Sequence, residues 1–358
     1  GRGLIYRRNV WTISAIAFVA FAAIAGAVIE HYTRKLLTKV DSGFGYQPNP
    51  EGVRLFLGEL AQPTFAEAGA DAMKNAVGRD TFLYRAVNVA HERKYGQPWK
   101  SWDQGSAGTC VSFAFALGEY TAEAVDHVAG KIKQPPAACA TEPIYGGSRT
   151  AARIPPMSRN NGGDGSYGGA AARWLTGRCE DKSIGGVLYR QPYGPFDLST
   201  YSIQLSRDWG RNGVPLELAR EANKRKAKCV QVQTWQELCA AIERGTPVAI
   251  CSTVGYGPTP RTRDASGFLS RGSSWSHAML AWAVRHKENG GGRDGALIQN
   301  SWYVQWVSGP RWPDDQPEGS FWASRQDVEA ALQQGDSWAI GTSYEWRDLQ
   351  NADWGLAL

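Results

Sequence analysis

The stretch that decides the fold reads Gln104-Gly105-Ser106-Ala107-Gly108-Thr109-Cys110 and leads into an apolar helical pattern. Apolar or small residues recur at three- and four-residue spacing as far as Val128, and Gly130 stands where a helix stop belongs. We therefore predict a buried helix whose first turn carries Cys110. Free N–H groups at a helix start, with an imidazolium beside them, lower a thiol pKa into roughly 3.5 to 7.5, so Cys110 is a candidate nucleophile.

The groups that would assist such a thiol lie elsewhere in the chain. His277 opens an apolar strand pattern that runs to His286, and Asn300 ends the next strand pattern, which begins at Ala296. Asn300 could therefore accept a hydrogen bond from one ring nitrogen of His277 and fix its tautomer. Gln104 offers a side-chain amide donor six residues before Cys110, near the place where an oxyanion would develop.

These blocks, in this order, resemble the papain-like cysteine peptidases. The resemblance rests on the Gln104 to Cys110 stretch, on Ser276-His277-Ala278, and on Asn300-Ser301-Trp302 followed by Trp306. A weaker fourth block, Gly162-Gly163-Asp164-Gly165-Ser166-Tyr167, is similar to the substrate-binding loop of the family. The resemblance covers roughly residues 100 to 345.

The resemblance implies an α+β fold with a helical lobe and a β-barrel-like lobe, and hydrolysis of peptide bonds in a peptide or protein substrate. It implies that Cys110 is the nucleophile, that His277 is the acid and base, and that Asn300 orients His277. Gln104 would hold the oxyanion. Gly165 and Ser166 would bind the substrate backbone, and Trp302 would shield the hydrogen bond between His277 and Asn300. No cofactor and no metal are expected.

Ala107 and Gly163 stand where the family has two cysteines that form a disulfide, and their joint absence indicates a divergent member from a reducing compartment or from a bacterial or viral lineage. Other departures support an alternative, because Val111 stands in place of Trp, and Ser276 and Tyr303 are also unusual. Residues 41–100 do not carry the long helical pro-region of secreted relatives. The alternative is therefore a catalytically inactive papain-like subunit that serves as a structural or interaction scaffold in a membrane complex or particle, with subunits of a larger complex as its partners. A peptide ligase or transferase using the same residues also stays open.

The N-terminal 40 residues carry the whole formal net charge of +5, because six basic side chains face one acid there and the remaining 318 residues are balanced. Val10 to Ile29 runs for 20 residues without a charge, which as a helix covers ~30 Å. We expect a single-pass membrane anchor of unknown orientation over residues 10–29. A signal peptide ending near Ala27 and an apolar helix buried in an assembly are the alternatives. The neutral remainder argues against a nucleic-acid partner.

The composition, with 42% hydrophobic and 20% charged residues, is that of a globular protein. We predict four parts: the apolar N-terminal segment at 1–40, an extension at 41–100, a helical lobe with the nucleophile at 101–215, and a strand-rich lobe with His277 and Asn300 at 216–358. None of the six cysteines forms a Cys-x-x-Cys pair, so a structural zinc site is not expected. A bridge between Cys139 and Cys179 stays open.

Overall fold

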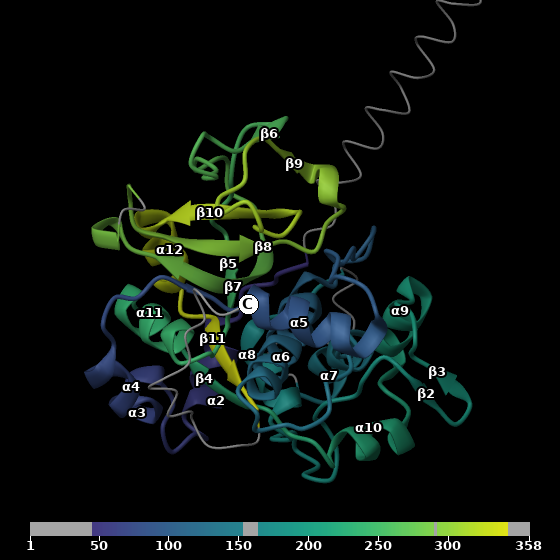
Figure 1. Ribbon diagram of the computed structural model, residues 1–358. Helices are drawn as coiled ribbons and strands as arrows, with labels where there is room; N and C mark the ends of the chain where they lie inside the picture. Colours follow the sequence, from purple (N-terminus) through teal and green to yellow (C-terminus); the bar gives the residue numbers. More distant parts are fainter. Residues whose placement is uncertain (1–44, 153–163, 290–291, 343–358) are drawn as a thin grey trace, which may run out of the picture. The chain divides into compact units, whose positions relative to one another are not determined.

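The computed structural model describes residues 45–152, 164–289 and 292–342 (Figure 1). The chain divides into two compact units, Gly1–Ser42 and Gly43–Leu358, and every described residue belongs to the second unit. Within the described ranges, no helix combines the length and the apolar character needed to cross a membrane. The anchor predicted at residues 10–29 lies outside the described residues.

The helices stand mostly in the first two thirds of the unit. They are α2 (Pro50–Leu57), α3 (Phe65–Ala68), α4 (Ala70–Asn75), α5 (Tyr84–Tyr95), α6 (Cys110–Val128), α7 (Glu142–Thr150), α8 (Gly168–Leu175), α9 (Ile203–Asn212), α10 (Leu216–Ala222), α11 (Trp235–Glu243) and α12 (Arg325–Leu332). Short 3-10 turns, η1 (Lys287–Asn289) and η2 (Val304–Trp306), follow later. The helix predicted from Cys110 is present.

The principal sheet has seven strands, and all of its pairs are antiparallel. Its order is β10 (Ser320–Ser324), β8 (Gly295–Gln299), β7 (His277–Arg285), β5 (Val248–Ser252), β11 (Ser337–Gly341) and β4 (Lys228–Gln231), with β1 (Thr81–Phe82) paired to β7. Two small sheets join β2 (Pro192–Tyr193) to β3 (Phe196–Asp197) and β6 (Arg261–Thr262) to β9 (Val307–Ser308). The strands predicted from His277 and from Ala296 are β7 and β8. The boundaries predicted at residues 100 and 215 stay predictions.

Helix α6 is the central helix, and it packs against β5, β7 and β11 (Figure 1). Nearly all of its residues are buried, including the polar side chains of Glu119 and Asp126, so the buried surface extends around the helix and is not limited to one apolar face. Gly118 makes the close contact possible, because a Cβ atom there would lie 2.5 Å from Cδ1 of Ile340 in β11 and 3.3 Å from Cδ1 of Leu280 in β7. This packing holds the first turn of α6 beside the start of β7.

Candidate active site

Antiparallel pairing of β7 with β8 brings His277 and Asn300 together, because the first residue of one strand lies near the residue that follows the other. The expected hydrogen bond between them is present, with 2.7 Å between Nε2 of His277 and Oδ1 of Asn300. Both side chains are buried. The 23 positions between His277 and Asn300 therefore correspond to β7, β8 and the loop that joins them.

A second donor fixes the chemistry of this contact. The backbone N–H of Ser301 also donates to Oδ1 of Asn300, at 2.8 Å. Because an N–H requires an acceptor, that atom of the Asn300 side chain is its oxygen, and Nε2 of His277 must carry the proton. In the neutral ring Nδ1 is then the basic nitrogen.

Cys110 is the first residue of α6, as predicted, and it is fully buried. Burial raises the pKa of its thiol to about 11, and backbone N–H groups of Ala278, Gly45 and Val111 and of Cys110 itself offset part of that rise. The lowered thiol pKa expected from the sequence is therefore wrong for this conformation. The helix start and neighbouring N–H groups act as expected, but the loss of water around the sulfur outweighs them.

Burial also shifts the pKa of His277, but it lowers this pKa because the charged form of histidine is the protonated one. Burial lowers the pKa of the imidazole to about 4, the hydrogen bond to Asn300 opposes this, and the positive charge of Arg261 adds to it. At neutral pH the site therefore holds a neutral imidazole and a neutral thiol. An ion pair between them requires water to reach the site.

Gln104 links the loop before Cys110 to the loop after β8. Its Nε2 donates to the carbonyl of Ala107 at 2.8 Å, its Oε1 accepts from Oγ of Ser301 at 2.7 Å, and its backbone N–H donates to the Ser301 carbonyl at 2.8 Å. The predicted oxyanion donor thus lies in the loop that leads to Cys110. Ser301, which the sequence analysis did not assign a role, orients this side chain from the residue next to Asn300.

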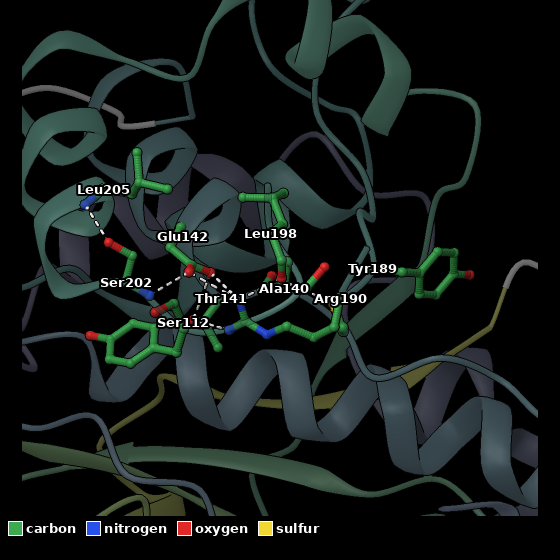
Figure 2. A network of polar contacts seen from close by, with 12 residues as sticks. Ser112, Ala140, Thr141, Glu142, Tyr189, Arg190, Leu198, Ser202 and Leu205 are labelled. Atoms are coloured by element: carbon green, nitrogen blue, oxygen red, sulfur yellow. Dashed lines mark hydrogen bonds and ion pairs between the residues drawn. The ribbon is translucent and has the colours of Figure 1, made fainter. Parts of the chain in front are cut away.

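A buried polar network around Glu142 and Arg190 contacts the segment that packs on the loop before Cys110. Figure 2 shows this network. Glu142 accepts from Arg190 at 2.7 Å and from the backbone N–H of Ser202 at 2.9 Å, while Arg190 also donates to Oγ1 of Thr141. The neighbour of Ser202 is Tyr201, whose hydroxyl donates to the Gln104 carbonyl at 3.2 Å. The ion pair therefore fixes the segment that carries this tyrosine.

The indole ring of Trp302 packs on the imidazole of His277. The two ring centroids are 4.6 Å apart, and Trp302 is buried. Trp275 and Trp306 pack on Trp302 at 5.3 and 5.2 Å, and Arg261 lies over all three indole rings. Sequence reasoning missed Trp275 and Arg261, although the position of Trp275 two residues before His277 was a usable signal.

Gly165 and Ser166 do meet an extended backbone, but it belongs to this chain. The N–H of Ser166 donates to the carbonyl of Gly45 and its carbonyl accepts from the N–H of Gln47, each at 2.8 Å, so Tyr46 and Ser166 form a parallel bridge. A Cβ atom on Gly165 would lie 2.4 Å from the carbonyl oxygen of Gly45. Gly162 and Gly163, at the start of this block, lie outside the described residues.

This covering segment, Gly45–Gln47, also reaches Cys110 and His277. The N–H of Gly45 is one of the groups that contact the Cys110 sulfur, and the N–H of Tyr46 donates to the carbonyl of Ser276 at 3.3 Å. The sequence analysis found no pro-region in residues 41–100 and missed this contact. The segment has no helical periodicity, because it binds as a short extended strand.

Comparisons with solved structures find proteins that are similar to this chain. Xylellain, a cysteine protease from Xylella fastidiosa, matches over 85% of this chain and 97% of its own, with 17% identity and a TM-score of 0.51. ProCathepsin B S9 from Trypanosoma congolense matches over 85% and 88%, with 11% identity and a TM-score of 0.46. The proform of Amb a 11 from ragweed pollen matches over 84% and 74%, with 13% identity and a TM-score of 0.47.

No family model and no curated protein sequence matches this chain. The likeness to xylellain shows that the chain has a papain-like mixed α+β fold, as the sequence predicts. All six cysteines lie in the described ranges and carry free thiols, so no bridge joins Cys139 to Cys179.

Proposed function

We propose that this chain is a cysteine peptidase that hydrolyses peptide bonds through Cys110, His277, Asn300 and Gln104. The observation that carries the proposal is the shared acceptor at Asn300, which holds the proton on Nε2 of His277 while Cys110 lies beside Ala278, the next residue of β7. A structural cysteine at a helix start does not require a histidine of fixed tautomer on the neighbouring strand.

In the acylation step the Cys110 thiol gives its proton to Nδ1 of His277, and the sulfur attacks the substrate carbonyl carbon. The side-chain amide of Gln104 and the backbone N–H of Cys110 stabilise the oxyanion. As the carbon–nitrogen bond breaks, Nδ1 returns the proton to the leaving amine. The hydrogen bond from Nε2 to Asn300 holds the imidazole in place throughout.

Deacylation uses the same groups in the second half of the reaction. Nδ1 of His277 takes a proton from water as the water oxygen bonds to the acyl carbon, and the carbon–sulfur bond breaks. The proton then returns to the Cys110 sulfur. Trp302 excludes water from the hydrogen bond between His277 and Asn300, which keeps that bond in a medium of low polarity.

The acyl side of the substrate would pair with Gly165 and Ser166 as an added strand, and the leaving side would lie next to Trp302. Gly45–Gln47 now makes the Ser166 hydrogen bonds that this substrate would need. The covering segment must therefore leave before a substrate binds, and the conformation described above is a closed one.

We further propose that residues 10–29 tether the enzyme to a membrane as a single span. The support is the uncharged run of 20 residues and the basic residues on either side of it. Replacing Ile16 and Ile24 together with lysine should release the full chain from the membrane fraction, because each buried charge opposes insertion by a few kcal/mol. A double variant that stays membrane-bound after a carbonate wash would contradict the tether.

Labelling of Cys110 tests the catalytic proposal. In full-length chain carrying Tyr46→Ala, which weakens the covering segment, a peptidyl epoxide or vinyl sulfone should label Cys110, and peptides should be cleaved. Both reactions should vanish when Cys110→Ala or His277→Ala is added, whereas Cys139→Ala, at a buried cysteine outside the site, should keep them. If a small alkylating reagent modifies Cys110 but no peptide is cleaved, the inactive scaffold would be favoured instead.

A further inference from the structure

The side chain of Tyr46 is buried against Asp336. Tyr46 is 5% exposed, and its hydroxyl hydrogen-bonds to the carboxyl group of Asp336, which is 2% exposed. Cys251 of β5 lies near the same hydroxyl, and Tyr46 and Asp336 both line an open pocket. The residue held against Ser166 therefore places its side chain in a buried site that ends at the carboxyl group of Asp336, and we call this site the Tyr46 pocket.

Asp336 is held rigidly by the protein itself. Its Oδ2 accepts from the backbone N–H of Gly168, and its Oδ1 accepts from the N–H of Gly169 and from Nε1 of Trp338, each at 2.8 Å. A Cβ atom on Gly168 would lie 2.6 Å from Oδ1, so only glycine allows this approach. The carboxyl group thus points one acceptor position at the pocket, and Tyr46 occupies it.

We propose that this pocket selects tyrosine in substrates, at the residue that pairs with Ser166, and that Asp336 is the specificity-determining residue. The inference rests on the proposed function. Gly45 contacts the Cys110 sulfur and Tyr46, its neighbour, pairs with Ser166. Tyr46 follows Gly45 and pairs with Ser166 in parallel, whereas the acyl-side residues of a substrate precede the attacked carbonyl, so a substrate would run in the opposite direction. The residue next to its attacked carbonyl would still lie at Ser166, with its side chain where that of Tyr46 now lies.

The carboxyl group of Asp336 would distinguish a tyrosine side chain from phenylalanine and from lysine. Phenylalanine fills the same volume but leaves the buried Asp336 without its fourth donor, and an unmade hydrogen bond to a buried acceptor is costly. Lysine brings a charge that must be desolvated. Burial raises the pKa of Asp336 to about 7, so at neutral pH the carboxyl carries only part of a negative charge to offset an ammonium group.

Matched covalent probes test the preference on full-length chain carrying Tyr46→Ala. The peptidyl vinyl sulfones differ only in the residue next to the one that bears the warhead, which is Tyr, Phe, 4-methoxy-Phe, Leu or Lys. We expect the tyrosine probe to label Cys110 about tenfold faster than the phenylalanine probe, since one hydrogen bond to a buried group separates them. The 4-methoxy probe has no donor and should be slower still than phenylalanine.

Asp336→Asn should reduce the tyrosine-to-phenylalanine ratio toward one. Because Asp336 also holds the start of α8, this variant can fail to fold, and the probe series on unaltered Asp336 then decides alone. Equal rates for the tyrosine and phenylalanine probes, or lysine as the fastest probe, would overturn the inference and leave the peptidase proposal intact. If no peptidyl probe labels a Cys110 that small reagents do reach, both proposals fail.

Discussion

The backbone of Gly45 meets the Cys110 sulfur with its N–H group, while its carbonyl oxygen is bound by the amide of Ser166. A thiolate attacks a carbonyl carbon, so the sulfur has no scissile carbonyl in front of it in this arrangement. The covering segment therefore covers Cys110 without presenting a carbonyl group to its sulfur. Its strength of binding should set how often Cys110 becomes reachable.

The first prediction concerns Tyr46. Tyr46→Ala removes a buried aromatic ring from the covering segment, which costs the closed form about 2 to 3 kcal/mol. The alkylation rate of Cys110 by iodoacetamide should rise by one to two orders of magnitude. Val77→Ala, at a 70% exposed position of the same N-terminal part, is the control and should leave the rate unchanged. An unchanged rate in Tyr46→Ala would mean that the segment does not limit access.

Gly45→Ala should open the site by a different route. A Cβ atom on Gly45 would lie 1.9 Å from the carbonyl oxygen of Gly108, so the segment must shift away from the loop before Cys110. We expect alkylation of Cys110 to accelerate at least as much as in Tyr46→Ala. Gly58→Ala is the matched control, since its Cβ atom meets nothing closer than 3.4 Å. If Cys110 in Gly45→Ala were alkylated no faster than in the unaltered chain, the segment would tolerate the added methyl group.

The buried ion pair of Glu142 and Arg190, near the loop before Cys110, should matter for stability. Glu142→Gln leaves Arg190 without its carboxylate in a buried site, which should lower the free energy of unfolding by about 3 to 5 kcal/mol. The exposed pair of Arg54 and Glu51 provides the control, and Glu51→Gln should leave the urea midpoint unchanged. Urea unfolding of the unaltered chain and of the two variants measures both effects. Similar midpoints for all three would contradict this role.

Acid should destabilise the closed protein through His277. Its pKa is about 4 in the folded chain and about 6.5 when unfolded. Below pH 6.5 the unfolded state binds the additional proton, so stability is lost as the pH falls from 6.5 toward 4, by roughly 3 kcal/mol for this group. The loss should be smaller in His277→Gln, whereas above pH 7 the two chains should follow the same slope. Parallel curves down to pH 4.5 would refute this linkage.

Much of the fold and part of the site follow from sequence pattern alone. The helix from Cys110, the strand from His277 and the position of Asn300 have local signals, namely periodicity, a glycine stop and strand ends. Ser301 and Arg261 could not be assigned in this way. Ser301 contacts Gln104 across 197 positions and Arg261 acts on His277 through space, and neither relation leaves a repeat in the sequence.

The contact of the covering segment with Ser166 could not be predicted from the sequence for a related reason. Gly45–Gln47 is three residues long and has no alternation to indicate a strand, and its partner Ser166 lies 120 positions away. Asp336 follows a helix and precedes β11, where an acid normally indicates only a turn. Its role depends on two glycine N–H groups and an indole that meet only in the folded chain.

The hydrogen bond between His277 and Asn300 has a consequence for assembly. A slip of β8 by one residue against β7 would turn every side chain of β8 to the opposite face of the sheet. The same slip would take the Asn300 oxygen away from His277, whereas the bond from the Ser301 amide joins neighbouring residues and would move with the strand. The bond between His277 and Asn300 therefore forms only when the two strands have their native alignment.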